Sequence, residues 1–390
     1  MKKNIQLILA AACFSTLFVA CNHASSTKTG SDKDSTAAQS PQIPDSANFK
    51  ATVQGKQVNL YTLKNKNGVT VAITNFGGRL VSLLVPNKDG KLTDVILGHD
   101  SLSGYQIKAE TYFGAIIGRY GNRIGKGKFS LDGKSYQLDL NDKINTLHGG
   151  FNGFYKQVFD AKKIGDQQLE LTYVSKDGEG GYPGTLTSKI TYTLTDDNAL
   201  KIEYSATTDK ATIVNLTNHA YFNLNGAGTP TITNDSLKID ADNITPVDTT
   251  LIPTGKFEKV KGTPFDFTSL KTIGADIDKT DDQLKAGKGY DHNFVLNKHD
   301  ISQSIATVKS PETGIVMDIY TTEPGLQFYS GNFLAGLSDG KGKATYAHRS
   351  ALCLETQHFP DSPNEPSFPS TVLKPGETYH TTTIYKFSVK

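Results

Sequence analysis

The 390-residue sequence has few cysteines and almost no net charge, and each scarcity excludes a class of protein. Of its three cysteines, Cys13 and Cys21 lie near the N-terminus, which leaves Cys353 alone in the body of the chain. One cysteine cannot form an intrachain disulfide there, and we expect Cys353 to be a small buried hydrophobic residue. The formal net charge is +2, with no basic patch interleaved with aromatics, so nucleic-acid binding is not predicted.

Common catalytic motifs are absent as well. There is no GxSxG elbow of a serine hydrolase and no phosphate-binding P-loop. Ligand-type side chains occur at His148, His219, Asp291 and Glu355, but no HExxH, CxxC or closely spaced histidine pair accompanies them. We therefore predict no metal.

The sequence lacks long amphipathic helices. The best short helical candidate is the polar turn 281–286, whereas β-rich runs separated by Gly and Asn dominate the body. Asp132-Gly133 is a strong hairpin signal between runs 127–131 and 135–140. Further strands are predicted at 58–63, 69–75, 79–85, 169–174, 186–194, 200–207, 304–308, 315–322, 352–356 and 381–389. With 36 glycines available for turns, this pattern predicts an all-β fold, a large antiparallel β-sandwich or barrel.

The first 48 residues have a different composition from the rest. Residues 1–20 begin with Lys2 and Lys3 and continue as a mostly apolar run, which is typical of an export signal. The run is too short and interrupted for a convincing membrane-spanning helix. Residues 17–21 resemble a bacterial lipoprotein signal, in which Cys21 would be lipidated, although Phe18 stands where leucine is usual. Ordinary signal cleavage nearby is the alternative.

Residues 22–48 are rich in Ser, Thr, Ala, Asp and Lys, a composition that predicts a flexible tether. The expected organisation is a signal peptide (1–20), a lipidated cysteine with its tether (21–48) and one domain (49–390). The protein would then be exported and anchored through Cys21 at the periplasmic or outer-membrane face of the cell envelope, or else be soluble in the periplasm.

One stretch, residues 215–224 (NLTNHAYFNL), places a histidine among asparagines and aromatics after an apolar run. His219 can exchange a proton near neutral pH, the amides can bind hydroxyls, and the aromatic faces can stack on a ligand. This mixture suits a neutral, hydroxyl-rich molecule such as a sugar. A core histidine in a β-strand is the alternative interpretation.

Five other stretches are rich in functional groups. They are GRYGNRI (118–124), NTLHGG (145–150), GYDHNF (289–294), GLQFYS (325–330) and LETQHFPDSPN (354–364). The arginines of the first could form a donor-rich wall or a charged surface turn. Paired glycines in the second could let backbone approach a ligand beside His148. In the last, strand alternation puts Cys353, Glu355 and Gln357 on one face, so Glu355 could be a base at the rim of a cleft.

Taken in order, these six stretches resemble the aldose 1-epimerases, also called galactose mutarotases. EGGYPG (179–184) and PSTVLKPGE (369–377) extend the likeness, which runs from about residue 50 to the C-terminus. Gly121 stands where alanine is frequent and Ala220 where serine is frequent, and neither difference removes a proton-transfer group. The signal and tether lie outside the likeness.

The resemblance implies a galactose mutarotase-like supersandwich with an open sugar cleft. It implies an isomerase that interconverts the α and β anomers of free aldohexoses such as galactose and glucose, as a monomer and without a cofactor. Glu355 would be the general base, ionised at neutral pH, and His219 the general acid, with a pKa near its usual value. The residues implied to bind the sugar are Asn122, Arg123, His148, Tyr221, Asp291 and Gln327.

Two other functions stay open at this point. One is a sugar-binding module on a lipid anchor, which would need no acid and base at one anomeric centre. The other is a sugar-phosphate 1-epimerase, which would need extra positive charge in the cleft. Arg119 and Arg123 are the candidates for that charge.

Overall fold

The computed structural model describes residues 41–107, 112–334, 336 and 339–390, which belong to one compact unit from Ser40 to Lys390. The expected signal, Cys21 and the tether up to residue 40 lie outside the described residues. Among the described residues, the first element is the 3₁₀ helix η1 (Ser46–Phe49), whose N-terminus is capped by the side chain of Asp45. Within the described residues, no helix is both long and apolar enough to cross a membrane.

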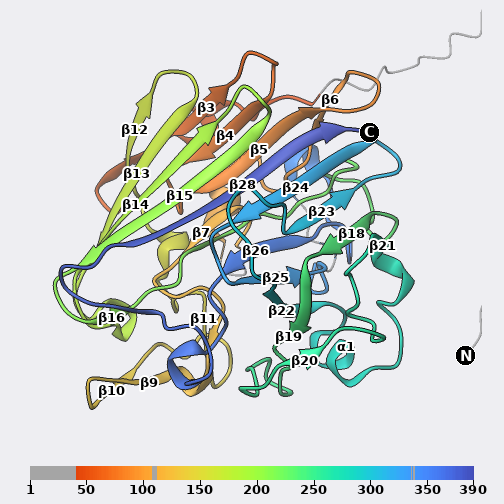
Figure 1. The fold of residues 1–390 in the computed structure, drawn as a ribbon. Helices are drawn as coiled ribbons and strands as arrows, with labels where there is room; N and C mark the ends of the chain where they lie inside the picture. Colours follow the sequence, from red (N-terminus) through yellow and green to blue (C-terminus); the bar gives the residue numbers. More distant parts are fainter. Residues whose placement is uncertain (1–40, 108–111, 335, 337–338) are drawn as a thin grey trace, which may run out of the picture. The chain divides into compact units, whose positions relative to one another are not determined.

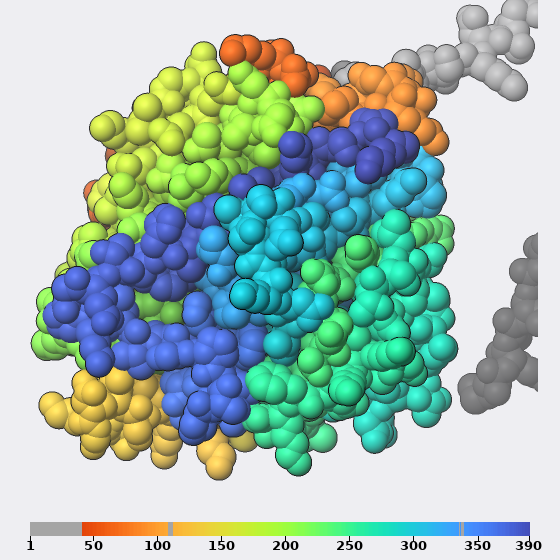
Figure 2. Space-filling view, in the orientation of Figure 1, coloured from red at the N-terminus to blue at the C-terminus, as the bar shows by residue number. Residues whose placement is uncertain are grey.

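The fold is nearly all β, and every pair of named strands is antiparallel. The largest sheet has nine strands in the order β12 (Asp160–Ile164), β13 (Gln168–Ser175), β14 (Leu186–Leu194), β15 (Ala199–Thr208), β28 (Tyr379–Val389), β24 (Ile315–Thr321), β23 (Ala306–Lys309), β18 (Ser236–Ile239) and β21 (Lys271–Thr272). In Figure 1 the C-terminal strand β28 crosses the molecule between β15 and β24. The space-filling view in Figure 2 shows these segments as adjacent bands on one face.

Two smaller sheets complete the scaffold. One has the order β3 (Leu60–Lys64), β4 (Thr70–Thr74), β5 (Arg79–Pro86) and β6 (Leu92–Asp94). The other has the order β20 (Glu258–Lys259), β19 (Ala241–Ile244), β22 (Asp291–Leu296), β25 (Gly325–Tyr329) and β26 (Cys353–Gln357). The two-stranded pairs are β1 (Ala51–Val53) with β2 (Lys56–Val58), β7 (Ala115–Ile117) with β17 (Thr217–His219), β8 (Arg123–Ile124) with β11 (Thr146–Leu147), β9 (Lys128–Leu131) with β10 (Lys134–Gln137), and β16 (Thr212–Ile213) with β27 (Val372–Leu373).

The main core lies between the sheets because their strands alternate in exposure. In β14, residues Leu186, Ile190 and Leu194 are buried, whereas Thr187 and Lys189 between them face solvent. Side chains from all three large sheets join one cluster of buried hydrophobic residues. Burying each leucine or isoleucine contributes about 1.5–3 kcal/mol, so this cluster is the main source of stability and gives the site a rigid support.

The structure confirms the predicted all-β, antiparallel architecture and most of the predicted strands. The hairpin between β9 and β10 turns at Asp132 and Gly133, whose positive φ values of 50° and 74° are those of the turn that this dipeptide favours. The short helix α1 (Asp282–Gly287) begins where the side chain of Asp281 accepts hydrogen bonds from the N–H groups of Gln283 and Leu284.

Candidate active site

One face of the five-stranded sheet brings together functional residues from distant parts of the sequence. Gln327 on β25 is paired with Asn293 on one side and with Glu355 on the other. Two residues along, Tyr329 is paired with Asp291 and with Cys353. Directly paired residues share a face, as do residues two apart on one strand. The register therefore places Asp291, Gln327, Tyr329, Cys353 and Glu355 on one surface.

His219 meets this surface from a different sheet. It ends β17, which pairs with β7 through His219 and Ala115. Its Nε2 atom lies 3.6 Å from Oε1 of Glu355, and the two side chains are only 6% and 2% exposed. The ring of Tyr221 stacks on the imidazole at 5.0 Å between centroids. The imidazole and the carboxyl group therefore face each other in a setting from which bulk water is largely excluded.

The other nitrogen of His219 faces the thiol of Cys353. The Sγ atom lies 3.4 Å from Nδ1, and Cys353 is fully buried. The burial predicted for Cys353 is confirmed, but its side chain also contacts the candidate acid. A polar neighbour on Nδ1 fixes the orientation of the ring and leaves Nε2 directed at Glu355.

His148 lies beside His219, with 5.0 Å between ring centroids and nearly perpendicular planes. Its Nδ1 accepts a hydrogen bond of 3.1 Å from the backbone N–H of Asn122, and the backbone N–H of His148 donates to the Asn122 carbonyl. Because Nδ1 is an acceptor, the proton of the neutral ring is on Nε2. His148 can thus donate a hydrogen bond to a ligand.

The tautomer of His148 also determines whether this residue can bind a metal ion. Ligand-type atoms of His148, His219 and Glu355 all lie within 4.8 Å of one another, so the structure gathers three of the four ligand-type residues seen in the sequence. However, one nitrogen of His148 accepts a backbone N–H and the other carries the proton. Neither nitrogen of the neutral ring offers a free lone pair, and a metal ion would have to displace the contact with Asn122.

Asp291 and Gln327 form the polar floor beside Glu355. Nε2 of Gln327 donates to Oδ1 of Asp291 at 2.7 Å, and Oε1 of Gln327 is buried without a protein partner. Arg123 donates from Nε to Asp142 at 2.9 Å, and its Nη1 lies 3.9 Å from Oδ2 of Asp291. These groups present fixed acceptors and donors at the separations that sugar hydroxyls can bridge.

These residues surround one cavity of about 190 Å³. Its lining residues are Tyr112, Asn122, Arg123, Leu147, His148, His219, Tyr221, Asp291, Tyr329, Phe333 and Glu355. Seven of the eight residues predicted to bind or transform a sugar are in this lining, and the eighth, Gln327, adjoins it through Asp291. Aromatic faces combined with a few polar groups are typical of a small-molecule site.

Comparison with known proteins identifies the family. Residues 59–386 match the family model described as aldose 1-epimerase. The chain is 45% identical to the galactose mutarotase of Mus musculus, over 82% of this chain and 92% of the mouse protein. It is 42% identical to the aldose 1-epimerase of Escherichia coli K12, over 85% of this chain and 96% of that protein. The chain belongs to the aldose 1-epimerase family.

A solved structure of a family member has the same fold. The aldose epimerase homologue from C. elegans superposes with a TM-score of 0.77 at 32% identity, covering 85% of this chain and 99% of that one. This aldose 1-epimerase family member is accordingly an isomerase, a mutarotase that interconverts aldose anomers.

Burial shifts the protonation of the facing pair in opposite directions. Loss of solvent lowers the pKa of His219 to about 3. The same cause, with a smaller contribution from the negative charge of Asp291, raises the pKa of Glu355 well above its usual value. The sequence-based expectation of an imidazole with an ordinary pKa is therefore wrong, because desolvation disfavours the charged form of each group.

Two sequence-based interpretations of this aldose 1-epimerase site are corrected. Arg119 does not contribute to a donor-rich wall, since its guanidinium is buried and donates to the carbonyls of Pro183 and Gly184 and to Ser175. Gly149 does not make room for a ligand: a Cβ there would lie 2.0 Å from the carbonyl oxygen of Gly118, so the glycine allows two backbone segments to pack.

Sequence reasoning also missed part of the site. Tyr112, Leu147 and Phe333 line the cavity but were not predicted, and Tyr329 was noted only as an aromatic within GLQFYS. Tyr112 packs edge-on against His148 with 4.7 Å between centroids. No spacing in the sequence marks these residues, because aromatics are equally common in the core of a β fold.

Proposed function

We propose that His219 and Glu355 are the acid and base of mutarotation and that the substrate is a free aldohexose such as galactose or glucose. The observation that carries the proposal is the 3.6 Å separation of Nε2 and Oε1 at the wall of one small cavity. Ring opening at an anomeric centre needs a proton removed from O1 and another delivered to O5. An acid and a base facing each other can serve both oxygens of one hemiacetal.

The proposed sequence of steps is balanced in protons. Glu355 removes the proton from the C1 hydroxyl while His219 protonates O5, and the C1–O5 bond breaks to leave an aldehyde. Rotation about C1–C2 presents the opposite face of the carbonyl. On closure Glu355 returns its proton to the carbonyl oxygen as the O5 hydroxyl attacks C1, and His219 recovers the proton of O5. The enzyme ends in its starting state.

The opposed pKa shifts fit this scheme. The pair with a neutral imidazole and a protonated carboxyl group holds the same number of protons as the pair with an imidazolium and a carboxylate. No exchange with solvent is needed to pass from one form to the other. A sugar that donates to Glu355 through O1 and accepts from His219 through O5 stabilises the charged form, because these hydrogen bonds replace the lost hydration.

The remaining polar groups are proposed to hold the sugar. His148 would donate from Nε2 to the ring oxygen or a neighbouring hydroxyl, while Asp291 and Gln327 would accept from hydroxyls. Asn122 and Arg123 would bind further sugar oxygens, and Tyr221 would keep His219 oriented. Such contacts contribute by fixing the anomeric carbon between the acid and the base.

A sugar-phosphate substrate is less well supported. Among the described residues that line the cavity, Arg123 is the one with a permanent positive charge, and it already faces Asp142 and Asp291. Arg119, the other candidate, donates its hydrogen bonds elsewhere. The lining also contains two carboxyl groups, Asp291 and Glu355, and each would repel a phosphate dianion when it is ionised.

Polarimetry distinguishes these functions. With freshly dissolved α-galactose or α-glucose, we expect the enzyme to accelerate the decay of optical rotation towards the equilibrium value. A decay rate equal to that in buffer would exclude these sugars as substrates. Binding without acceleration would favour the sugar-binding module, and acceleration confined to a sugar phosphate would favour the third candidate.

The pH dependence of kcat/KM should differ from that of an ordinary histidine–glutamate pair. The active pair holds one proton, and it gains a second only as pH falls towards the His219 pKa of about 3. It loses its single proton as pH rises through the raised pKa of Glu355. We therefore expect no fall in kcat/KM as pH falls through 4.5, the usual pKa of a glutamic acid. Initial rates by polarimetry, corrected for buffer catalysis, test this; a decline centred at 4.5 would contradict it.

We also propose that the protein is exported and anchored in the cell envelope through a lipidated Cys21, and that residues 21–39 act as a tether for the compact unit that begins at Ser40. The support is the charged, then apolar N-terminus followed by a polar segment. An anchored mutarotase would supply neighbouring importers or enzymes with the anomer that they prefer.

Labelling of the full-length protein with radioactive palmitate tests the anchor. We expect the label in membrane fractions, its loss in Cys21→Ala and its retention in Cys13→Ala, because only the cysteine after the signal would be acylated. Unlabelled wild-type protein, or protein found only in the cytosolic fraction, would refute the anchor.

A further inference from the structure

Asn215 is a fully buried amide that contacts two segments of the chain outside its own. Its Nδ2 donates to the carbonyl of Gly121 and to the carbonyl of His358, each at 3.2 Å. Its Oδ1 accepts the backbone N–H of His358 at 3.0 Å. The backbone of Asn215 adds further bonds, accepting from Gly121 and donating to Arg119. Both amide donors and one acceptor site of this side chain are thus used.

The segments joined by this amide are the ones that carry the site. Asn215 itself precedes His219 by four residues. Gly121 directly precedes Asn122, and His358 follows Glu355 by three residues. One side chain therefore ties the segment of the proposed acid to the segment of the proposed base and to the segment that fixes the tautomer of His148.

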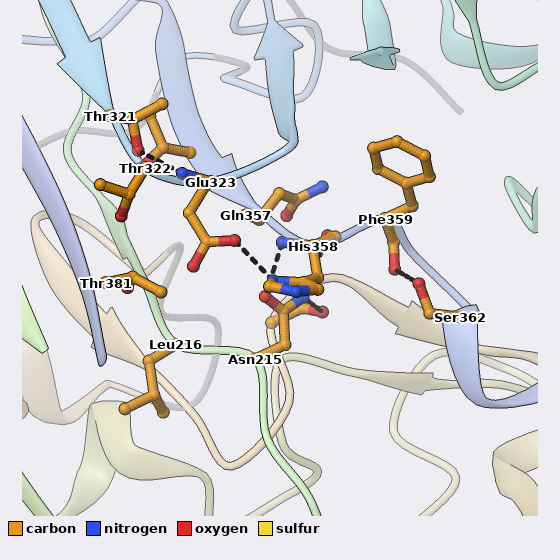
Figure 3. A network of polar contacts seen from close by, with 12 residues as sticks. Asn215, Leu216, Thr321, Thr322, Glu323, Gln357, His358, Phe359, Ser362 and Thr381 are labelled. Atoms are coloured by element: carbon orange, nitrogen blue, oxygen red, sulfur yellow. Dashed lines mark hydrogen bonds and ion pairs between the residues drawn. The ribbon is translucent and has the colours of Figure 1, made fainter. Parts of the chain in front are cut away.

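A second set of polar contacts, made by Glu323, joins the same two segments as Asn215. Oε2 of Glu323, a buried carboxylate, lies 2.6 Å from Nδ1 of His358. The other carboxylate oxygen accepts from the hydroxyl of Tyr379 at 3.1 Å, and that hydroxyl accepts the backbone N–H of Leu216. Figure 3 shows Glu323 pointing at the imidazole of His358, with Asn215 against the backbone of the same residue. The contacts thus close a ring from residue 358 through Glu323 and Tyr379 back to residue 216.

Burial lowers the pKa of His358, but the hydrogen bond to Glu323 and the negative charge of that residue raise it above its usual value, so the contact is a charge-assisted one. A closed, satisfied network of this kind in a low-dielectric interior is rigid, because breaking any one contact leaves a buried polar group unpaired. The segments it joins belong to different sheets, β17 and β26, which share no ladder pairing with each other.

We propose that Asn215 is a positioning residue for mutarotation, with the His358–Glu323 pair as its support. Its role is to hold His219 and Glu355 at the separation that lets both reach one hemiacetal. It is not among the residues that line the cavity, so it acts on the rate of the proton transfers and not on sugar binding. The inference rests on the acid and base roles proposed above.

The test compares Asn215→Ala with Asn75→Ala in the full-length protein. Asn75 is a matched control: it is buried, its Nδ2 donates to the carbonyls of Gln57 and Phe159, and its Oδ1 accepts the N–H of Asn59. It makes the same number and kind of hydrogen bonds, but none of its partners lies in a segment that carries the site.

We expect Asn215→Ala to lower kcat by about 10- to 100-fold, the effect of a displacement of up to 1 Å between reacting groups, with KM changed by less than about 3-fold. Asn75→Ala should keep kcat within about 2-fold of wild type at a similar loss in Tm. A 1-deoxy sugar, which retains O5 and the other hydroxyls but lacks O1, should bind Asn215→Ala with an unchanged Kd by calorimetry.

Equal kcat losses in the two variants, or a loss in Asn215→Ala confined to KM, would overturn the proposal. If Asn215→Ala does not fold, Asn215→Asp decides by the same criteria, since it keeps the shape and the acceptor for His358 but loses both donated bonds. Failure of the underlying roles is recognised separately, because Glu355→Gln would then retain the wild-type kcat whatever Asn215 does.

Discussion

Glu355→Gln is expected to lower kcat by about 10²–10⁴-fold, the usual contribution of a single proton-transfer group. Glutamine has nearly the same shape, but its amide oxygen is too weak a base to take a proton from the C1 hydroxyl. KM should change little, because the amide can still form a hydrogen bond to the sugar. The measurement is the polarimetric decay of α-galactose at saturating concentration, with the uncatalysed rate subtracted.

The loss should not come from unfolding. Because the folded state raises the pKa of Glu355, ionisation of this carboxyl group destabilises the fold as pH rises above the unfolded-state pKa. The neutral amide removes that cost, so the Tm of Glu355→Gln at alkaline pH should equal or exceed that of wild type. A kcat within a few-fold of wild type would refute the role of Glu355.

Asp235→Asn is a matched control for this variant. Asp235 is also a buried carboxyl group with one oxygen that lacks a protein partner, and burial raises its pKa to about 7. It is not among the residues that line the active-site cavity. Its replacement should leave kcat within about 2-fold of wild type, because a buried carboxyl group outside the cavity affects stability and not the proton transfers.

His219→Asn is expected to lower kcat by about 10²–10³-fold. Asparagine places its amide near the position of Nδ1, so the contact with Cys353 can persist while the Nε2 group that serves O5 is lost. The neighbouring His148, which carries a proton on Nε2, should leave some residual activity. Stopped polarimetry on α-glucose and α-galactose provides the measurement, and His99→Asn, a buried histidine outside the cavity lining, provides the control.

The double variant Glu355→Gln/His219→Asn tests whether the two residues act as a unit. If proton removal and proton delivery are concerted, the second substitution should add little to the loss caused by the first. A multiplicative loss would mean that the two groups act independently, and wild-type turnover in His219→Asn would remove it from the mechanism.

Much of the fold was predictable because the signals are local. The run 186–194 matches β14. Alternate residues of this strand are buried, and the sequence shows this as an alternation of residue types. The Asp132-Gly133 hairpin was equally clear, since few other residues accept positive φ at both positions. By contrast, β7 and β17 have only three residues each, and no periodicity can be read from so short a strand.

The candidate site was predictable in its residues but not in its chemistry. His219 and Glu355 stood in motifs that resemble the family, and the structure brings them together in one cavity. Their pKa shifts could not be foreseen, because desolvation depends on what the fold packs around each group. For the same reason Arg119, which looks like a partner of Arg123 in the sequence, forms its hydrogen bonds away from the cavity.

The sequence by itself determined the antiparallel β class, the family likeness and the choice of His219 and Glu355 as the proposed proton-transfer groups, because these follow from residue order alone. The tertiary structure decided that Gln327 pairs with Glu355, that Asn122 fixes the tautomer of His148, and that Asn215 ties the acid's segment to the base's. Each of these depends on contacts between residues far apart in the chain, and a contact, unlike a residue type, exists only once the sheets have packed.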